Sequence, residues 1–229
     1  MMHVKPREIW FIRHGESVAN AGARTNEASG YALTELGFRQ AEQVAIALPH
    51  GPELIVHSPY ARARLTALPS IQRFGDVAVE EWPVHEVQYL DPAKCVGTTQ
   101  EERRAMSLEY WERCDPDHAE PNAESFTVFI ERVRQAIRGL SQRRERQIFV
   151  YGHGQFMSAV AWLVLSKPVA IDRTAMRRFY QFIHGYAVPN CSVMPLYVHP
   201  EGGHSLGGLW LPDGVDAASA NLAGGLAGV

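Results

Sequence analysis

The chain has 229 residues, of which 46% are hydrophobic and 21% are charged, so it can bury the core of one large α/β domain or two small ones. Its formal net charge of -3 provides no overall attraction to nucleic acid or to an anionic membrane. We therefore expect no nucleic acid or membrane partner, and any anion site must be a local cluster of basic residues.

Strands and helices are expected to alternate along the chain, because short apolar runs precede segments with apolar residues at helical spacing. Thr34 is placed to cap the first helix and Ser58 the second, with Pro59 as a first helical residue. This order predicts an α/β fold, a three-layer sandwich with a predominantly parallel central sheet and helices on both faces. The expected strands cover residues 8–12, 54–57, 77–79, 147–151 and 191–197, and the expected helices cover residues 35–48, 58–74, 100–113, 125–143, 156–165 and 174–184.

The last thirty or so residues differ in composition from the rest. Glycines recur throughout residues 200–229 and leave few side chains to pack. We predict a single domain over residues 1–199, with no linker dividing it, and a glycine-rich C-terminal extension over residues 200–229. Part of this extension, mainly at its end, is expected to be mobile.

Cysteine usage and the N-terminus bear on the cellular compartment. Cys95, Cys114 and Cys191 are widely spaced and form no CxxC pair, which argues against a disulfide framework and a zinc cluster. The N-terminus lacks the apolar core and cleavage site of a signal peptide, and no run approaches the ~20 apolar residues of a membrane span. A soluble, cytoplasmic protein with reduced thiols is the prediction.

Three of the expected strands end at residues suited to phosphate binding. Arg13 and His14 follow the first strand, Arg62 lies one turn into the helix after the second, and His153 follows the strand over residues 147–151. Taken singly, each is equally well a solvated arginine or a hydrogen-bonded histidine. Because such strand ends meet at one edge of a sheet, their shared position favours a phosphate site.

Four segments in this order strengthen that interpretation: residues 13–20 (RHGESVAN), 33–37 (LTELG), 58–64 (SPYARAR) and 152–154 (GHG). They resemble the motifs of the histidine phosphatase superfamily, in its phosphoglycerate-mutase-like branch, and the resemblance spans residues 8 to about 198. It implies a phosphoglycerate-mutase-like fold and an enzyme that hydrolyses a small phosphorylated metabolite. It also implies that no metal or cofactor is needed, and that the chain forms a homodimer.

The resemblance also implies roles for individual residues. His14 would attack phosphorus and carry the phosphoryl group as phosphohistidine, which splits one difficult displacement into two easier ones. Ser17 would either donate to the phosphate or cap the helix that it starts. Positive charge and hydrogen-bond donors around the phosphoryl group would stabilise it during transfer. The expected phosphate ligands are Arg13, Ser17, Asn20, Arg62 and a protonated His153.

An acid must protonate the leaving oxygen, and by its position Glu86 resembles the acid of the family. Glu80 and Glu81 are the rivals, but they form a charged pair at the end of an expected strand, which is typical of solvent exposure. Glu86 is flanked by Val84 and Val87, so partial burial is expected to raise its pKa toward neutrality. One carboxyl group can then serve as acid and later as base.

Three other functions stay open at this stage. A phosphoglycerate-type mutase is disfavoured because the interval between Glu86 and Glu124 lacks the proline-rich, arginine-paired insert of those enzymes. A metal-dependent phosphoesterase needs closely spaced Asp and His ligands, and the chain has no Asp-x-His or paired histidine motif. A non-catalytic module that binds a phosphorylated ligand is the third. Substrate choice is expected to reside in residues 87–123 and 173–184, and a sugar phosphate, a nucleotide or a phosphorylated carboxylic acid would each fit.

Overall fold

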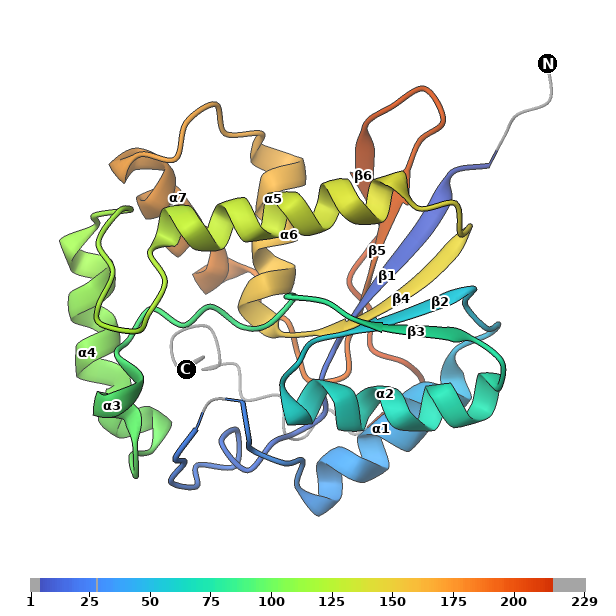
Figure 1. Ribbon diagram of the computed structural model, residues 1–229, viewed down its shortest axis with the longest axis horizontal. Coiled ribbons are helices and arrows are strands. Elements are labelled where there is room, and N and C mark those ends of the chain that lie inside the picture. The colour runs from blue at the N-terminus through green and yellow to red at the C-terminus, as the bar shows by residue number, and fades with distance from the viewer. Residues whose placement is uncertain (1–4, 28, 216–229) are drawn as a thin grey trace.

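A single central sheet organises the fold (Figure 1). The computed structural model describes residues 5–27 and 29–215. Its strands are β1 (Arg7–Arg13), β2 (Leu54–His57), β3 (Ala78–Glu81), β4 (Gln147–Gly152), β5 (Val193–Val198) and β6 (His204–Leu206). They lie side by side in the order β3-β2-β4-β1-β5-β6. The first four of these are mutually parallel, whereas β5 runs antiparallel to β1 and β6 antiparallel to β5, so the sheet is predominantly parallel, as predicted.

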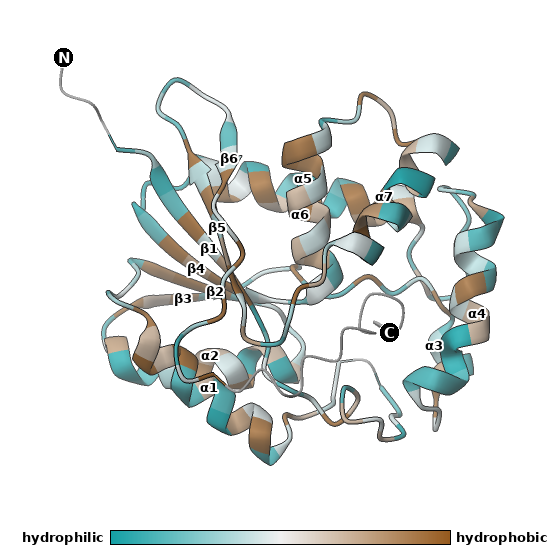
Figure 2. Cartoon of the chain, turned by 180° about the vertical axis from the view of Figure 1, so that it is seen from behind, coloured by the Kyte–Doolittle hydropathy of each residue, from teal (hydrophilic) through white to brown (hydrophobic). Residues whose placement is uncertain are grey.

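Helices cover both faces of this sheet. They are α1 (Glu35–Ala47), α2 (Ala61–Phe74), α3 (Pro92–Cys95), α4 (Gln100–Arg113), α5 (Phe126–Gln142), α6 (Gly154–Ser166) and α7 (Arg173–Gly185). Figures 1 and 2 place α1 and α2 on one face and α5 and α6 on the other, while α3 and α4 lie to one side of the layers. The predicted three-layer α/β sandwich is confirmed.

Successive side chains of β1 are buried on opposite faces of the sheet, so each face needs a layer of helices. Ile9 and Phe11 are buried in the core formed with α5, α6 and α7. Trp10 and Ile12 are buried in the opposite core, which α1 and α2 complete. Successive side chains of a strand point to opposite faces, so an apolar run with no polar alternation requires a helix layer on each side.

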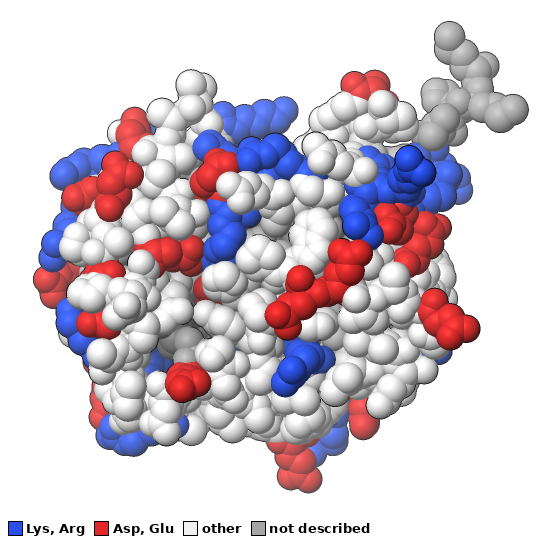
Figure 3. Space-filling view, in the orientation of Figure 1, with Lys and Arg blue, Asp and Glu red and all other residues white. Residues whose placement is uncertain are grey.

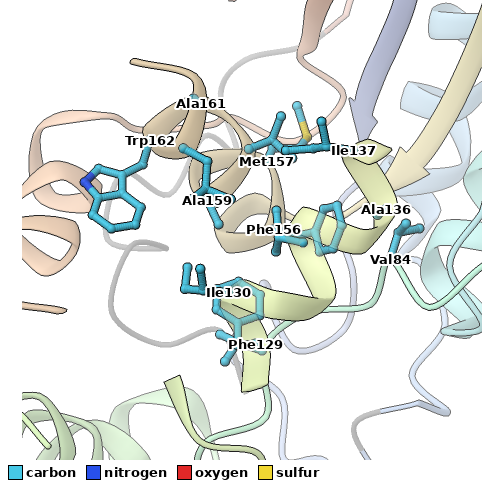
Figure 4. Packing of buried hydrophobic residues seen from close by; sticks show 14 of the residues in the cluster. Val84, Phe129, Ile130, Ala136, Ile137, Phe156, Met157, Ala159, Ala161 and Trp162 are labelled. Carbon is cyan, nitrogen blue, oxygen red and sulfur yellow. The ribbon is translucent and has the colours of Figure 1, made fainter. Parts of the chain in front are cut away.

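The larger core lies between the sheet, α5 and α6. Figure 4 shows Phe129 and Ile130 of α5 close to Phe156 and Ala159 of α6, with Val84 from the segment after β3 at the edge of the group. All five residues are fully buried. This packing fixes the start of α6, which follows directly from the end of β4.

The surface carries charges of both signs. In the face shown in Figure 3, basic and acidic side chains are interspersed, in keeping with the small net charge. Within residues 5–27 and 29–215, no helix has the length and apolar character that crossing a membrane requires.

The expected helix cap at Ser58 is wrong. α2 begins at Ala61, its N-cap residue is Tyr60, and no side chain caps it. The Ser58 hydroxyl oxygen instead accepts from the Tyr60 backbone N–H and lies 2.8 Å from Nε2 of His153. The tertiary contact with a buried histidine therefore takes the hydroxyl that the local pattern assigned to the helix.

Short elements and the C-terminal region account for the other differences. Sequence periodicity did not predict α3, which has four residues and so cannot show a helical repeat, or β6, which has three residues and no apolar run. Residues 204–206, in the expected C-terminal extension, pair with β5, and Trp210 bridges to Val193. The division at residue 199 stays a prediction, and the mobility expected for the last 15 or so residues concerns positions that lie almost wholly outside the described residues.

Candidate active site

The loop after β1 is built against two helices. The Gly15 N–H donates to Oγ1 of Thr66 in α2 (3.0 Å), and the Glu16 N–H donates to Oε1 of Gln40 in α1 (2.8 Å). Thr34 caps α1 as predicted, and its hydroxyl also donates to Oε1 of Glu16 (2.7 Å). The residues that follow the first strand are therefore held by side chains from both helices of one layer.

Close backbone contact explains Gly37 in the first turn of α1. A Cβ atom added at Gly37 would lie 2.0 Å from the carbonyl oxygen of Glu16, and one added at Gly15 would lie 2.6 Å from the carbonyl oxygen of Gly37. No side chain fits between this loop and α1 without moving the backbone.

Gly37→Ala is accordingly expected to lower the free energy of unfolding by about 1–3 kcal/mol or more, because the added methyl group forces α1 away from the loop. Thermal unfolding would measure this. Gly185→Ala is the matched control, since a Cβ there meets nothing within 4 Å at the end of α7. Equal melting temperatures for the two variants would contradict the close-packing argument.

The four basic residues predicted at the strand ends come together. The Arg62 Nε–H donates to Nε2 of His14 (3.1 Å), and the His14 and His153 ring centroids are 5.1 Å apart. The Arg13 side chain lies over Gly154, where a Cβ would be 3.3 Å from its Nε. All four side chains are buried. The carboxyl ends of β1 and β4 and the start of α2 thus form one basic cluster.

The hydrogen bonds of His14 indicate its tautomer. Nδ1 lies 2.7 Å from the carbonyl oxygen of Gly15, and because a carbonyl only accepts, Nδ1 carries the proton. Nε2 then holds the lone pair and accepts from Arg62. Burial, followed by the charges of Arg62 and Arg13, lowers the pKa of His14 well below 6.5. The ring is therefore neutral at pH 7, as a nucleophile must be.

The two arginines are positioned differently. Arg13 donates from Nη1 to the Val188 carbonyl (2.5 Å), and its buried Nε has no hydrogen-bond partner among residues 5–27 and 29–215. The Arg62 guanidinium lies 4.9 Å from the ring centre of Tyr60 and 5.1 Å from that of Tyr31. Arg62 thus lies against two aromatic rings with its Nε directed at His14, while a backbone carbonyl fixes one end of the Arg13 fork.

The charge of His153 depends on its surroundings. Burial, then the positive charge of Arg62, lowers its pKa well below 6.5, so the ring is neutral at pH 7 in this structure. Its Nε2 contacts the Ser58 hydroxyl, and its buried Nδ1 lacks a partner in the described part of the chain. A protonated His153 thus requires additional negative charge nearby, which a bound phosphate would supply.

Glu86 lies at the same cluster, at the first turn of α6. Its carboxylate oxygens accept from the backbone N–H groups of Gln155 and Phe156, both at 3.2 Å. Burial raises its pKa above 4.5, and this effect exceeds the opposing influence of those N–H groups and of the Arg62 and Arg13 charges. A carboxyl group with a raised pKa beside basic residues is suited to proton transfer.

The rival carboxylates lie elsewhere. Glu80 accepts from Arg143 (2.7 Å) and from the Trp82 indole N–H (2.8 Å) on the edge strand β3. Glu81, the last residue of β3, is exposed. The structure therefore brings Glu86, and neither rival, into the electrostatic surroundings of Arg13 and Arg62.

Ser17 and Asn20 form a small network behind His14. The Ser17 hydroxyl donates to Oδ1 of Asn20 (3.0 Å), which also accepts from Nδ2 of Asn190 (3.3 Å). Asn190 donates in addition to the His14 carbonyl (2.8 Å). Because the oxygen of the Asn20 side-chain amide accepts these hydrogen bonds, its NH₂ group is the part that can donate to an anion.

The expectation that Ser17 starts a helix is wrong. Residues 18–22 form turns, and Ser17 pairs with Leu33 in an isolated β-bridge. The Asn20 side chain accepts both the backbone N–H and the hydroxyl of Ser17, a local arrangement that competes with helix formation. Donation by Ser17 to a phosphate remains a proposal.

The segment over residues 87–123 contacts the loop that follows β1. Thr25 bridges to Thr98, and Arg24 pairs with Glu102 of α4 (2.5 Å). Loop residues shortly after Asn20 thus contact the segment where substrate choice is expected. Tyr89 and Trp111 of this segment and Phe126, the first residue of α5, are buried in the core. Arg177 and Arg178 are exposed on α7.

Several residues at the site were not predicted from the sequence as functional. Thr66 and Asn190 support the loop through hydrogen bonds that span large separations along the chain. Tyr31 and Tyr60 lie against Arg62. For Ser58 the sequence predicted a helix cap and not a role at the site. A Ser or Asn beside a proline indicates only a turn. Nothing local in the sequence marks any of these residues as part of a site.

The fold and this cluster are those of an α/β enzyme that acts on phosphate esters. The chain belongs to the histidine phosphatase superfamily, since the model of that family's branch 1 matches residues 9–205. It is 28% identical over 174 residues to a probable phosphoglycerate mutase from Erwinia tasmaniensis, which covers 72% of this chain and 78% of that protein. It is also 28% identical over 170 residues to an adenosylcobalamin/alpha-ribazole phosphatase from Salmonella typhi, which covers 71% of this chain and 81% of that protein.

Solved structures share the fold. Mycobacterial glucosyl-3-phosphoglycerate phosphatase matches with a TM-score of 0.69 and 24% identity, over 90% of this chain and 100% of that one. An alpha-ribazole-5'-P phosphatase from Escherichia coli, described as putative in its structure report, matches with a TM-score of 0.67 and 23% identity, over 89% and 96%. The likeness to these structures concerns the fold, which they share over about nine-tenths of this chain.

Proposed function

We propose that the chain is a metal-independent phosphatase that hydrolyses a small phosphomonoester through a phosphohistidine on His14. The observation that carries this proposal is the orientation of His14, a buried neutral ring whose Nε2 lone pair lies against the Arg62 guanidinium. Nε of Arg13 and Nδ1 of His153 are buried and have no hydrogen-bond partner within residues 5–27 and 29–215, which supports a site for an anion at this cluster.

In the first step, Nε2 of His14 forms a bond to phosphorus while the bond from phosphorus to the ester oxygen breaks. The proton of the Glu86 carboxyl group passes to the leaving oxygen, so an alcohol departs. Arg62 exchanges its bond to His14 for one to a phosphate oxygen, and Arg13, Asn20 and His153 bind the others. These donors are in place before the reaction, which is what makes electrostatic stabilisation effective.

In the second step, water attacks phosphorus and the bond to Nε2 of His14 breaks. The Glu86 carboxylate accepts the proton from the water, which restores its acid form and releases inorganic phosphate. No metal ion takes part in either step. The homodimer and the cytoplasmic location are further proposals that follow from family membership and composition.

A phosphoglycerate-type mutase is the second candidate, because a relative carries that name. A mutase would return the phosphoryl group from His14 to another hydroxyl instead of to water. The relatives named as alpha-ribazole phosphatases and the glucosyl-3-phosphoglycerate phosphatase structure support hydrolysis instead. All these names are consistent with a small phosphorylated metabolite as the substrate.

A panel of sugar phosphates, nucleotides and phosphorylated carboxylic acids is expected to include at least one ester from which the native protein releases phosphate in the presence of excess chelator. Phosphoglycerate isomerisation would be measured in parallel. Isomerisation faster than phosphate release would favour the mutase. Binding of esters with no turnover of any would favour a non-catalytic module, and loss of turnover in chelator would favour a metal-dependent enzyme.

A further inference from the structure

One ion pair lies directly behind the segment that carries Glu86. Arg132 of α5 and Glu124, just before α5, meet fork to fork, with 3.1 Å between Nε and Oε2 and 2.5 Å between Nη2 and Oε1. Only 12% and 14% of these side chains are exposed, whereas the pair between Arg138 and Glu131 on the same helix is 57% and 43% exposed. The inner pair is therefore shielded and geometrically fixed.

This pair bonds to the backbone on both sides of Glu86. Nη1 of Arg132 donates to the carbonyl oxygens of Pro83 (3.0 Å) and His85 (2.8 Å). The Gln88 N–H donates to Oε1 of Glu124 (3.2 Å), and the Glu124 N–H donates to the Gln88 carbonyl (2.8 Å). Two side chains thus satisfy backbone groups before and after the proposed acid.

The same guanidinium also lies against the surface that receives the Glu86 carboxyl group. Its Cζ is 5.3 Å from the ring centre of Phe129 and 5.8 Å from that of Phe156. The Phe156 N–H donates to Glu86, and Figure 4 shows both phenylalanines in one group of buried side chains with Val84 at its edge. Arg132 therefore connects the backbone of the acid segment with the first turn of α6.

Such support is needed because residues 82–90 form no helix or strand. Without the ladder of hydrogen bonds that regular structure supplies, the position of Glu86 depends on side chains. Val84 and Val87 are buried, but apolar contact alone sets direction poorly. A displacement of about 1 Å at a catalytic group can cost roughly a hundredfold in rate.

We propose that Arg132, paired with Glu124, is a positioning residue that holds the Glu86 carboxyl group against the first turn of α6. This inference rests on the proposed function, in which Glu86 moves the proton. The largest charge effects on the pKa of Glu86 come from Arg62 and Arg13. Arg132 acts through the backbone of residues 83–88, so its removal mislocates the acid and leaves the phosphate ligands in place.

The test compares a poor leaving group, phenyl phosphate, with a good one, 4-nitrophenyl phosphate. For Arg132→Gln, kcat/KM, which reports the first phosphoryl transfer in this two-step mechanism, is expected to fall about 10- to 100-fold with phenyl phosphate and by no more than about threefold with 4-nitrophenyl phosphate. Glu124→Gln, which keeps an oxygen for the Gln88 N–H, is expected to lose less. Arg138→Gln, from the exposed pair on α5, is the matched control and should resemble the native protein.

A double variant separates positioning from a general weakening of the fold. If Arg132 acts through Glu86, adding Arg132→Gln to Glu86→Gln should lower kcat/KM for phenyl phosphate by no more than about twofold further. Equal losses for both esters in Arg132→Gln, or full additivity in the double variant, would overturn the inference. Failure of the proposed function looks different, because Glu86→Gln alone would then affect both esters equally. Should Arg132→Gln not fold, Arg132→Lys is measured by the same criteria, because its single ammonium group cannot span the same four acceptors.

Discussion

His14→Ala is expected to abolish phosphoryl transfer, with turnover lowered by about 10⁴-fold or more, because no other group at the site can take the place of Nε2. The native protein, mixed rapidly with a ³²P-labelled ester that it hydrolyses and then denatured, should carry a label that is stable in alkali and lost in acid. That stability is the behaviour of a phosphorus–nitrogen bond. The variant should carry none.

His57 offers a matched control for this experiment. It is also buried at a strand end, and its Nδ1 lies 2.9 Å from the carbonyl of the next residue, as in His14. Because the proposed mechanism gives it no part, His57→Ala should still form the labelled intermediate. Undiminished labelling of His14→Ala would place the phosphoryl group on another residue and refute the assigned nucleophile.

Glu86→Gln is expected to lower kcat/KM for an alkyl phosphate by about 10²- to 10⁴-fold and to have a much smaller effect on 4-nitrophenyl phosphate, whose leaving oxygen needs no proton. Glutamine retains an oxygen that can accept from Gln155 or Phe156, so the fold should be preserved. In the native protein, kcat/KM for the alkyl ester should fall as pH rises through the raised pKa of Glu86. That limb of the pH profile should vanish in the variant.

Stability measurements check the same carboxyl group independently. Because burial raises the pKa of Glu86 in the folded state, ionisation costs stability, and this cost grows as pH rises from the unfolded pKa through the folded one. Glu86→Gln should therefore unfold at a temperature equal to or above that of the native protein at pH 8, with any advantage lost near pH 4. Strong destabilisation at pH 8 would show that the ionised carboxylate is structurally required.

Long apolar runs made most of the fold predictable. Segments such as residues 8–12 and 147–151 are continuous in β-favouring residues and end at glycine or at charged residues, so local pattern and tertiary environment agree there. The convergence of Arg13, Arg62 and His153 followed from the same reasoning, since parallel strands share one carboxyl edge. The topology of the sheet therefore predicted which residues meet at the site.

Features that depend on burial or on distant contacts could not be predicted in this way. The neutral charge of His153 arises from complete burial beside Arg62, which no local pattern encodes. Ser58 had a helix cap as its local interpretation and Ser17 either a helix cap or a phosphate donor, and each hydroxyl bonds within the site. Short polar side chains serve caps and sites equally well, so their roles are decided by tertiary structure.

The central place of β1 has a consequence for synthesis of the chain. Both neighbours of this strand, β4 and β5, come from the last third of the described residues, so β1 leaves the ribosome long before either partner exists. The His14 carbonyl likewise gains its hydrogen bond from Asn190 only after that residue has been made. Contacts of such long range close slowly and expose an apolar strand meanwhile. A nascent chain therefore carries its RHGES segment early but gains the full phosphate site only after residues 147–198 have been made.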